Sequence, residues 1–293
     1  MSFTSDEIAR QPQAWRQAAE VAATASGLPR PGERIAVVGC GTSLYVARAY
    51  AGLRERAGLG ETDAFAASEF PADRRYDRYV AISRSGTTTE VLDFLAGRRG
   101  RGGGPTVALT AVPSMPIGEL ADSIVDLSFA DERSVVQTLF ATTALAALRA
   151  SLGQDVGPLA DRAAVAVEAE LDRAWLAAGQ FTFLGRGWAF GVAQEAALKL
   201  REAVTDWTEA YPTMEYRHGP IAIAGPGRVV WHFGPGGEQL RSEVTATGAL
   251  LVTHDEDPQV DLIRVHRLAV ERAASRGLDP DQPRHLTRAV VLS

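Results

Sequence analysis

The segment that decides the fold is Ile35-Ala36-Val37-Val38-Gly39-Cys40-Gly41-Thr42-Ser43, in which four apolar residues run into a glycine turn. A helical stretch then extends to about Ala57. This order predicts a buried strand, a tight turn and a helix, the basic unit of a parallel α/β fold. The turn is not a dinucleotide-binding fingerprint, because Leu44 stands where the third glycine is required.

Short apolar runs resembling this first strand recur along the whole chain. We predict strands at residues 64–67, 79–83, 106–110, 124–127, 181–184, 228–233 and 249–253. Helical patterns lie between them, including residues 88–95, a long helix after Gly187, and residues 259–276. Strands that alternate with helices indicate parallel sheets covered on both faces.

The remaining segments are connections and covering helices. Residues 6–26 read as a helix, which Pro12 is expected to break or kink. Residues 132–179 are mostly helical and Ala-rich, with breaks near Gly153 and Pro158. The basic, glycine-rich segment 98–105 reads as a loop.

An internal repeat divides the chain into two halves. Gly39 and Gly41 align with Gly185 and Gly187, and Glu69 aligns with Glu215, all at the same offset. We therefore predict two similar α/β domains, at residues 1–165 and 166–293.

The composition excludes several classes of protein. The 293 residues carry a formal net charge of -6, which argues against a nucleic-acid partner. No apolar run reaches about 18 residues, so we expect no membrane segment. The polar start does not resemble a signal peptide, and the single cysteine allows no intrachain disulfide. These features favour a cytoplasmic protein. The histidines show no metal-ligand spacing, so we predict neither a metal nor a cofactor.

The segment Ser83-Arg84-Ser85-Gly86-Thr87-Thr88 is the best candidate for a binding site. It follows an apolar strand and precedes a helix, and its hydroxyl groups are short donors on a turn that Gly86 permits. A phosphate needs several such donors, and the start of a helix favours an anion. An ordinary helix cap rich in Ser and Thr is the alternative. The second half has Gly234-Pro235-Gly236-Gly237 at the corresponding place, so we expect one phosphate site per chain.

Several motifs together resemble the tandem sugar isomerase (SIS) domain family, and above all the isomerase region of glucosamine-6-phosphate synthase. The first half contributes the glycine turn, Ser68-Glu69-Phe70 and the hydroxyl-rich loop, while the second half contributes Glu195-Ala196-Ala197-Leu198-Lys199-Leu200-Arg201-Glu202, His218-Gly219-Pro220 and Gln282-Pro283-Arg284-His285-Leu286. The resemblance covers essentially the whole chain.

This resemblance implies two flavodoxin-like SIS domains and a homodimer that shares its active sites. It implies that Glu202 moves a proton between C1 and C2 of a hexose or hexosamine 6-phosphate, and that His218 from the partner subunit assists ring opening. The implied phosphate contacts are Ser83, Ser85 and Thr88, with Thr42 and Ser43 nearby, and Val135 and Gln137 line the sugar site.

The spacing of the helix residues gives the implied base only partial support. Glu195, Lys199 and Glu202 lie at i, i+4 and i+7 on one helix stripe, and a solvated ion pair is the alternative explanation. A carboxylate suits removal of a proton next to a carbonyl, and Lys199 would hold it ionised. Cys40 is expected to have a packing role.

The sequence departs from the synthase pattern at several places, among them Thr87 in place of a glutamate and Leu139 in place of a lysine. It begins directly with the sugar isomerase region, so we expect no glutamine-dependent amide transfer. Arg288 replaces the lysine that forms a Schiff base, and a guanidinium is not nucleophilic at neutral pH. Arg288 could instead hold a carboxylate, a phosphate or a sugar hydroxyl. Arg84 replaces a glutamine and could strengthen phosphate binding or meet an acidic substituent.

These departures leave several functions open. The first is an isomerase or deaminase acting on an amino-sugar 6-phosphate. The second is a lyase or dehydratase, in which the same base takes the C2 proton of an N-acetylhexosamine 6-phosphate and the group at C3 leaves. A deglycase for sugar–amine adducts is the third, and a non-catalytic sugar-phosphate sensor is the fourth. The presence of Glu202 and His218 favours an enzyme.

Overall fold

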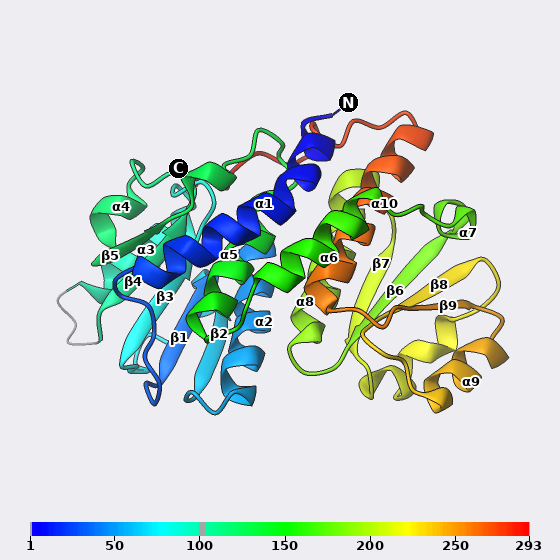
Figure 1. The fold of residues 1–293 in the computed structure, drawn as a ribbon, viewed down its shortest axis with the longest axis horizontal. Coiled ribbons are helices and arrows are strands. Elements are labelled where there is room, and N and C mark those ends of the chain that lie inside the picture. The colour runs from blue at the N-terminus through cyan, green and yellow to red at the C-terminus, as the bar shows by residue number, and fades with distance from the viewer. Residues whose placement is uncertain (1, 100–103, 293) are drawn as a thin grey trace.

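The chain folds around two parallel β-sheets that lie side by side (Figure 1). The computed structural model describes residues 2–99 and 104–292. One sheet has the order β2-β1-β3-β4-β5 and the other β7-β6-β8-β9. The strands are β1 Ile35–Gly39, β2 Thr62–Ala66, β3 Arg78–Ile82, β4 Thr106–Thr110, β5 Ser123–Asp126, β6 Gln180–Gly185, β7 Thr208–Pro212, β8 Arg228–Phe233 and β9 Leu250–Thr253.

The predicted α/β fold is confirmed, and each strand predicted from an apolar run lies within two residues of an observed one. The strand β7 was not predicted. It forms an edge of the second sheet and only Thr208 in it is buried, so it lacks the continuous apolar run of a central strand. The halves repeat each other, because β1 pairs with β2 and β3 as β6 pairs with β7 and β8.

Helices cover both sheets and fill the space between them. They are α1 Phe3–Thr24, α2 Thr42–Arg56, α3 Thr89–Arg98, α4 Ile117–Leu120, α5 Leu139–Ser151, α6 Gly157–Glu168, α7 Arg173–Ala177, α8 Ala189–Val204, α9 Glu238–Ala246 and α10 Pro258–Ser275. Short 3₁₀ turns lie at Ala67–Glu69, Ser128–Ala130, Glu215–Arg217 and Pro220–Ile223. None of the helices described is long and apolar enough to cross a membrane.

The helix α1 runs unbroken from Phe3 to Thr24, so the break expected at Pro12 does not occur. The helix packs along α5 and α6, with Ala14, Trp15 and Ala18 buried in that contact. Tertiary packing of this kind outweighs the loss of one backbone hydrogen bond. Of the predicted basic loop at 98–105, residues 100–103 lie outside the described part of the chain.

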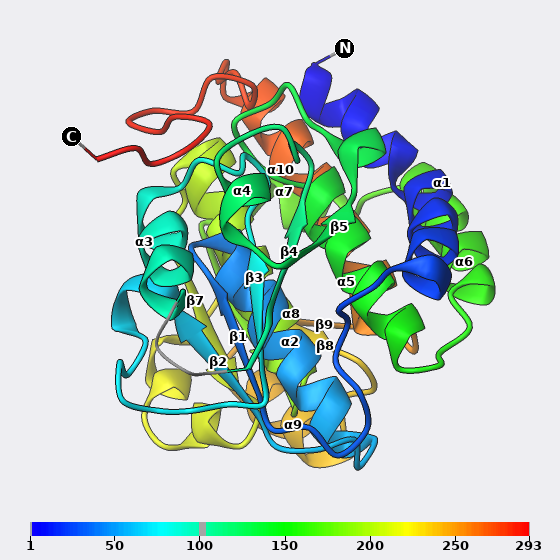
Figure 2. The same cartoon turned by 90° about the vertical axis from the view of Figure 1, so that its left-hand side faces the viewer.

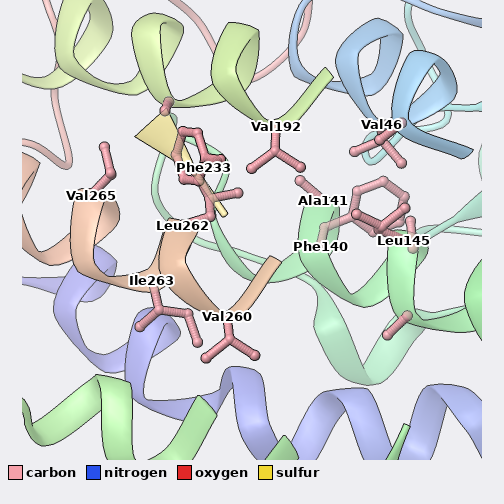
Figure 3. Close-up of a cluster of buried hydrophobic side chains, with 14 of the residues drawn as sticks. Val46, Phe140, Ala141, Leu145, Val192, Phe233, Val260, Leu262, Ile263 and Val265 are labelled. Carbon is pink, nitrogen blue, oxygen red and sulfur yellow. The ribbon is translucent and has the colours of Figure 1, made fainter. Parts of the chain in front are cut away.

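A continuous apolar core joins the two halves (Figure 3). It contains Val46 of α2, Ala141 and Leu145 of α5, Val192 of α8 and Leu262 of α10. The helices α2 and α8 cross closely, because Gly191 has no side chain. A Cβ added at Gly191 would lie 2.6 Å from the backbone nitrogen of Ala49. This crossing sets the position of α8 relative to the carboxyl end of β1.

Candidate functional site

The hydroxyl-rich loop lies where β3 ends and α3 begins, at the carboxyl edge of the first sheet. Ser83 and Ser85 are buried and Thr88 is half-buried. The hydroxyls of Ser83 and Thr88 lie 3.4 Å apart, and Ser85 Oγ accepts hydrogen bonds from the amide and the hydroxyl of Thr87. Three of the residues predicted to contact phosphate therefore lie in one tight turn.

Backbone amides add donors to this loop. Within the described residues, the amides of Ser85, Gly86 and Thr88 have no hydrogen-bond acceptor. Gly86 has a φ of 67°, and a Cβ on it would lie 2.8 Å from Ile117 and 3.0 Å from Met115. Only glycine fits this turn without strain. Amides and hydroxyls that share a helix start form a site suited to an anion.

The Arg84 side chain does not lie among these donors. Its guanidinium is buried, and Nη1 donates to the carbonyls of Ser134 (2.9 Å) and Val135 (3.3 Å). Nη2 donates to the carbonyl of Arg288 at 2.6 Å. Burial lowers the pKa of Arg84, although the charge of Glu132 opposes this. Arg84 therefore binds backbone carbonyl groups of two other segments. Its position does not support the predicted phosphate contact.

Buried carboxylates hold the loop that carries Val135 and Gln137. Glu132 Oε1 accepts from the amides of Thr138 and Leu139, both at 2.6 Å. Burial raises the pKa of Glu132 despite the nearby charge of Arg84. Gln137 Oε1 is buried without a partner among the described residues, so it is free to accept a hydrogen bond from a ligand.

Glu7 of α1 fixes the same loop from the other side. Its carboxylate accepts from the amide of Arg133 at 2.6 Å and from the hydroxyl of Ser134. Neither Glu7 nor Glu132 was predicted as a site residue. The partners of Glu7 lie more than a hundred residues away, and those of Glu132 are at the start of α5, so no sequence spacing marks either carboxylate.

The helix α8, which carries the predicted base, meets the glycine turn of the first half at Lys199. Its Nζ donates to Thr42 Oγ1 at 2.9 Å and to Glu202 Oε2 at 2.6 Å, and it lies 3.7 Å from Glu195 Oε1. Lys199 is fully buried, whereas the Glu202 side chain is 19% exposed. Thr42 opens α2 directly after β1, and Ser43 beside it is also buried. This contact places the predicted base at the edge of the first sheet.

The charge of Lys199 is secured by its neighbours. Burial alone would lower its pKa, but the charges of Glu202 and Glu195 outweigh burial and raise it. Lys199 is therefore an ammonium ion throughout the neutral range. The ammonium donates to Glu202 Oε2 at 2.6 Å, so the predicted base has a cation as its direct partner.

His218 lies apart from this group. It ends the 3₁₀ turn Glu215–Arg217 after the edge strand β7, and its side chain is exposed. In the part of the chain described, it has no hydrogen bond or ion pair to the loop at 83–88 or to Glu202. A contribution from a partner subunit stays a prediction.

The C-terminal tail crosses from α10 to the first half and ends near α3 (Figure 2). Arg288 forms an exposed ion pair with Asp131, while its carbonyl is held by Arg84. The amide of Thr89 donates to the carbonyl of Val290, and Leu292 donates to the Thr89 hydroxyl. The tail therefore borders the candidate phosphate loop, and its Val290 carbonyl accepts a hydrogen bond from the first amide of α3.

Comparisons with known proteins agree with this architecture. No family model matches the chain. The chain is 30% identical over 353 residues to a glutamine–fructose-6-phosphate aminotransferase (isomerizing) from Pyrobaculum aerophilum, and 28% identical over 366 residues to the protein of that name from Xanthomonas campestris. Each match covers 99% of this chain but only 57% and 59% of the relative. The chain thus spans little more than half the length of these relatives.

Solved structures match over the whole fold. A glucosamine-6-phosphate deaminase from Thermotoga maritima has a TM-score of 0.82 and 27% identity, with 99% of this chain and 100% of that chain covered. The C-terminal domain of a glucosamine-fructose-6-phosphate aminotransferase from Francisella tularensis has a TM-score of 0.80, 22% identity and coverage of 97% and 98%. The second match shows the shared fold alone.

Proposed function

Because the chain is a tandem sugar isomerase (SIS) protein, homologous to the isomerase region of these aminotransferases, we propose that it removes the C2 proton of a hexosamine 6-phosphate. The observation that carries this proposal is the position of Lys199. Its hydrogen bonds to Thr42 and Glu202 join the carboxylate of the second half to the turn beside the phosphate loop.

The proposed roles follow from the geometry. Ser83, Ser85 and Thr88 hold the phosphate together with the free amides of their turn, and Thr42 and Ser43 lie at the neighbouring strand end. Val135 and Gln137 line the sugar. Glu202 takes the proton from C2 of the open-chain sugar and returns it to C1, so that the aldehyde becomes a hydroxymethyl group.

For an amino sugar, this proton shift converts the C2 amine to an imine. Water then adds at C2 and ammonia leaves, which gives a ketose 6-phosphate. The similarity to a glucosamine-6-phosphate deaminase, at 27% identity, supports deamination as the proposed reaction. A substrate amine also removes the need for the Schiff-base lysine that Arg288 replaces.

A second candidate is elimination from an N-acetylhexosamine 6-phosphate. Glu202 takes the same proton, and the electron pair expels the group at C3. The ion pair of Arg288 with Asp131 is the observation that favours it, because neither group can form a covalent adduct with the sugar carbonyl. Both candidates share the C2 proton removal.

A product assay separates the candidates. The protein is incubated with glucosamine 6-phosphate, N-acetylglucosamine 6-phosphate and fructose 6-phosphate, and products are followed by mass. Ammonia with a ketose phosphate supports deamination, and loss of water from the acetylated sugar supports elimination. Cleavage of a sugar–amine adduct would indicate a deglycase. Binding of these sugars without turnover of any would indicate a sensor and overturn the proposal.

We further propose that the enzyme is a homodimer in which His218 enters the partner's site to assist ring opening. Hybrids made by mixing E202Q and H218A subunits test this arrangement. If the two residues act across the interface, each hybrid dimer keeps one intact site, and a random mixture recovers roughly a quarter of wild-type activity. If both act within one subunit, the mixture stays inactive.

A further inference from the structure

A series of buried polar side chains leads from α1 through α10 to the catalytic helix α8. Gln11 of α1, His266 of α10 and Glu195 of α8 are each at most 2% exposed. Gln11 Nε2 lies 3.2 Å from His266 Nδ1, and His266 Nε2 lies 3.7 Å from Glu195 Oε2. Glu195 Oε1 in turn lies 3.7 Å from Lys199 Nζ. The elements that carry the series also contribute Val192 of α8 and Leu262 of α10 to the apolar core in Figure 3.

Hydrogen bonding on α1 and α5 favours one tautomer of His266. Trp15 Nε1 donates to Thr142 Oγ1 at 3.0 Å, which leaves the hydroxyl proton of Thr142 for an acceptor. The acceptors within reach are Gln11 Oε1 at 2.9 Å and the carbonyls of Thr138 and Leu139 at 3.1 and 3.3 Å. When the proton goes to the nearest of these, Gln11 Oε1, the NH₂ group of Gln11 faces His266 Nδ1, which then accepts. The hydrogen of the neutral ring is then on Nε2, directed at Glu195.

Glu195 needs this donor. Within the described residues, neither of its oxygens has a hydrogen bond, and neither does His266 Nε2. Burial of a carboxylate without hydrogen-bond partners is unfavourable. Its nearest donors are His266 Nε2 on one side and Lys199 Nζ on the other. The other charged groups that act on Lys199 are Glu202 on the same helix and Glu132 before α5. Gln11 is the neutral contact from α1.

We propose that His266 is a positioning residue, whose Nε2–H holds Glu195 as a second counter-ion of Lys199 and so keeps the ammonium between Thr42 and Glu202. The inference rests on the proposed role of Glu202 as base. With both carboxylates in place, Lys199 is shared between them, and Glu202 is left free to take a proton. Without the His266 contact, Glu195 is no longer held beside Lys199, which then pairs with Glu202 alone.

Matched variants at His266 test the proposal. H266L removes the donor, whereas H266Q keeps an amide N–H that reaches toward Glu195. We expect H266L to lower kcat roughly tenfold and to move the acid limb of kcat/KM to lower pH, because Lys199 then pairs with Glu202 alone. H266Q should restore the wild-type limb. E195Q should lower kcat and move the acid limb as H266L does, and H266L/E195Q should show no larger effect than either single variant.

The proposal would be overturned if H266L kept the wild-type acid limb, or if the acid limb of H266Q moved as far as that of H266L. Additive effects of H266L and E195Q in the variant H266L/E195Q would also overturn it. A second measurement does not depend on turnover. Imidazole ¹⁵N NMR of the wild type should show His266 protonated on Nε2 alone at neutral pH, and a hydrogen on Nδ1 would overturn the assignment. If wild type processes no hexosamine 6-phosphate, the proposed function fails, and the NMR result still decides what His266 does.

Discussion

Lys199 Nζ lies 2.9 Å from Thr42 Oγ1, so that a helix of the second half touches the first turn after β1 across 157 residues of sequence. The same ammonium lies 2.6 Å from Glu202. The proposed phosphate loop lies in the first half and the proposed base in the second, so the proposed site needs both halves.

Replacing Lys199 by methionine should destabilise the fold. The change leaves Glu195 buried without a counter-charge, and loss of one member of a buried ion pair costs about 3–5 kcal/mol. The free energy of unfolding at pH 7, from urea titration, measures the loss. The variant K199M/E195Q should recover part of it, and equal instability of the two variants would contradict the account.

The pH dependence of stability should reveal the same ammonium. Its pKa in the fold is above the ordinary value of 10.5, because the charges of Glu202 and Glu195 outweigh burial. The stabilisation is therefore complete below pH 10.5 and is lost as the pH rises through the higher folded value. The difference in Tm between wild type and K199M should be constant from pH 7 to 10 and then shrink. A difference that grows above pH 10 would exclude this assignment.

Gly191 sets the distance between α8 and α2. In G191A the added Cβ would meet the backbone of Ala49 at 2.6 Å, so the helices must separate. We expect a loss of about 1–3 kcal/mol in stability and a fall in kcat, because Lys199 moves away from Thr42. Gly97, whose added Cβ would meet nothing, gives the matched control G97A. A kcat unchanged in G191A would show that the crossing does not position the site.

The phosphate loop should control affinity for the phosphorylated sugar. S83A and S85A each remove one donor to a charged group, worth about 1.5–3 kcal/mol, so KM should rise roughly ten- to a hundredfold. The exposed Ser242 of α9 supplies the control S242A. Inorganic phosphate should compete with substrate in wild type and compete less in the two loop variants. Unchanged KM in both would place the phosphate elsewhere.

Arg84 should hold the tail. R84A removes the donor to the carbonyl of Arg288 and those to Ser134 and Val135, so the tail should detach more often. Limited trypsin digestion at Arg284 and Arg288 should then be faster in R84A than in wild type or in the exposed control R173A. Equal rates of cleavage in all three proteins would show that the tail is held by other contacts.

The sequence predicts the fold well because the information is local. Apolar runs mark the central strands of both sheets, and glycine turns mark the starts of α2 and α8. The edge strand β7 has only one buried residue and escapes this pattern. The continuity of α1 through Pro12 could not be predicted, since it depends on packing against helices more than a hundred residues away.

The candidate site is predictable only in part. The hydroxyls of the loop at 83–88 follow from their spacing on a turn, and the carboxylates of α8 follow from helical periodicity. The position of Arg84 does not, because its partners are carbonyl groups from distant loops. No sequence pattern marks Glu7, Glu132 or His266 either, because buried polar contacts between elements do not recur at a fixed spacing.

Hydrogen exchange at C2 tests the central claim most directly. Glucosamine 6-phosphate carrying deuterium at C2 is incubated with wild type and with E202Q, and the deuterium that leaves C2, either to C1 of the product or to water, is measured by NMR. We predict that wild type removes the deuterium from C2 and that the rate of this removal falls roughly a hundredfold or more in E202Q, which binds the sugar with unchanged affinity. Product formed with deuterium still on C2, or equal removal by E202Q, would contradict the assignment of Glu202 as the base.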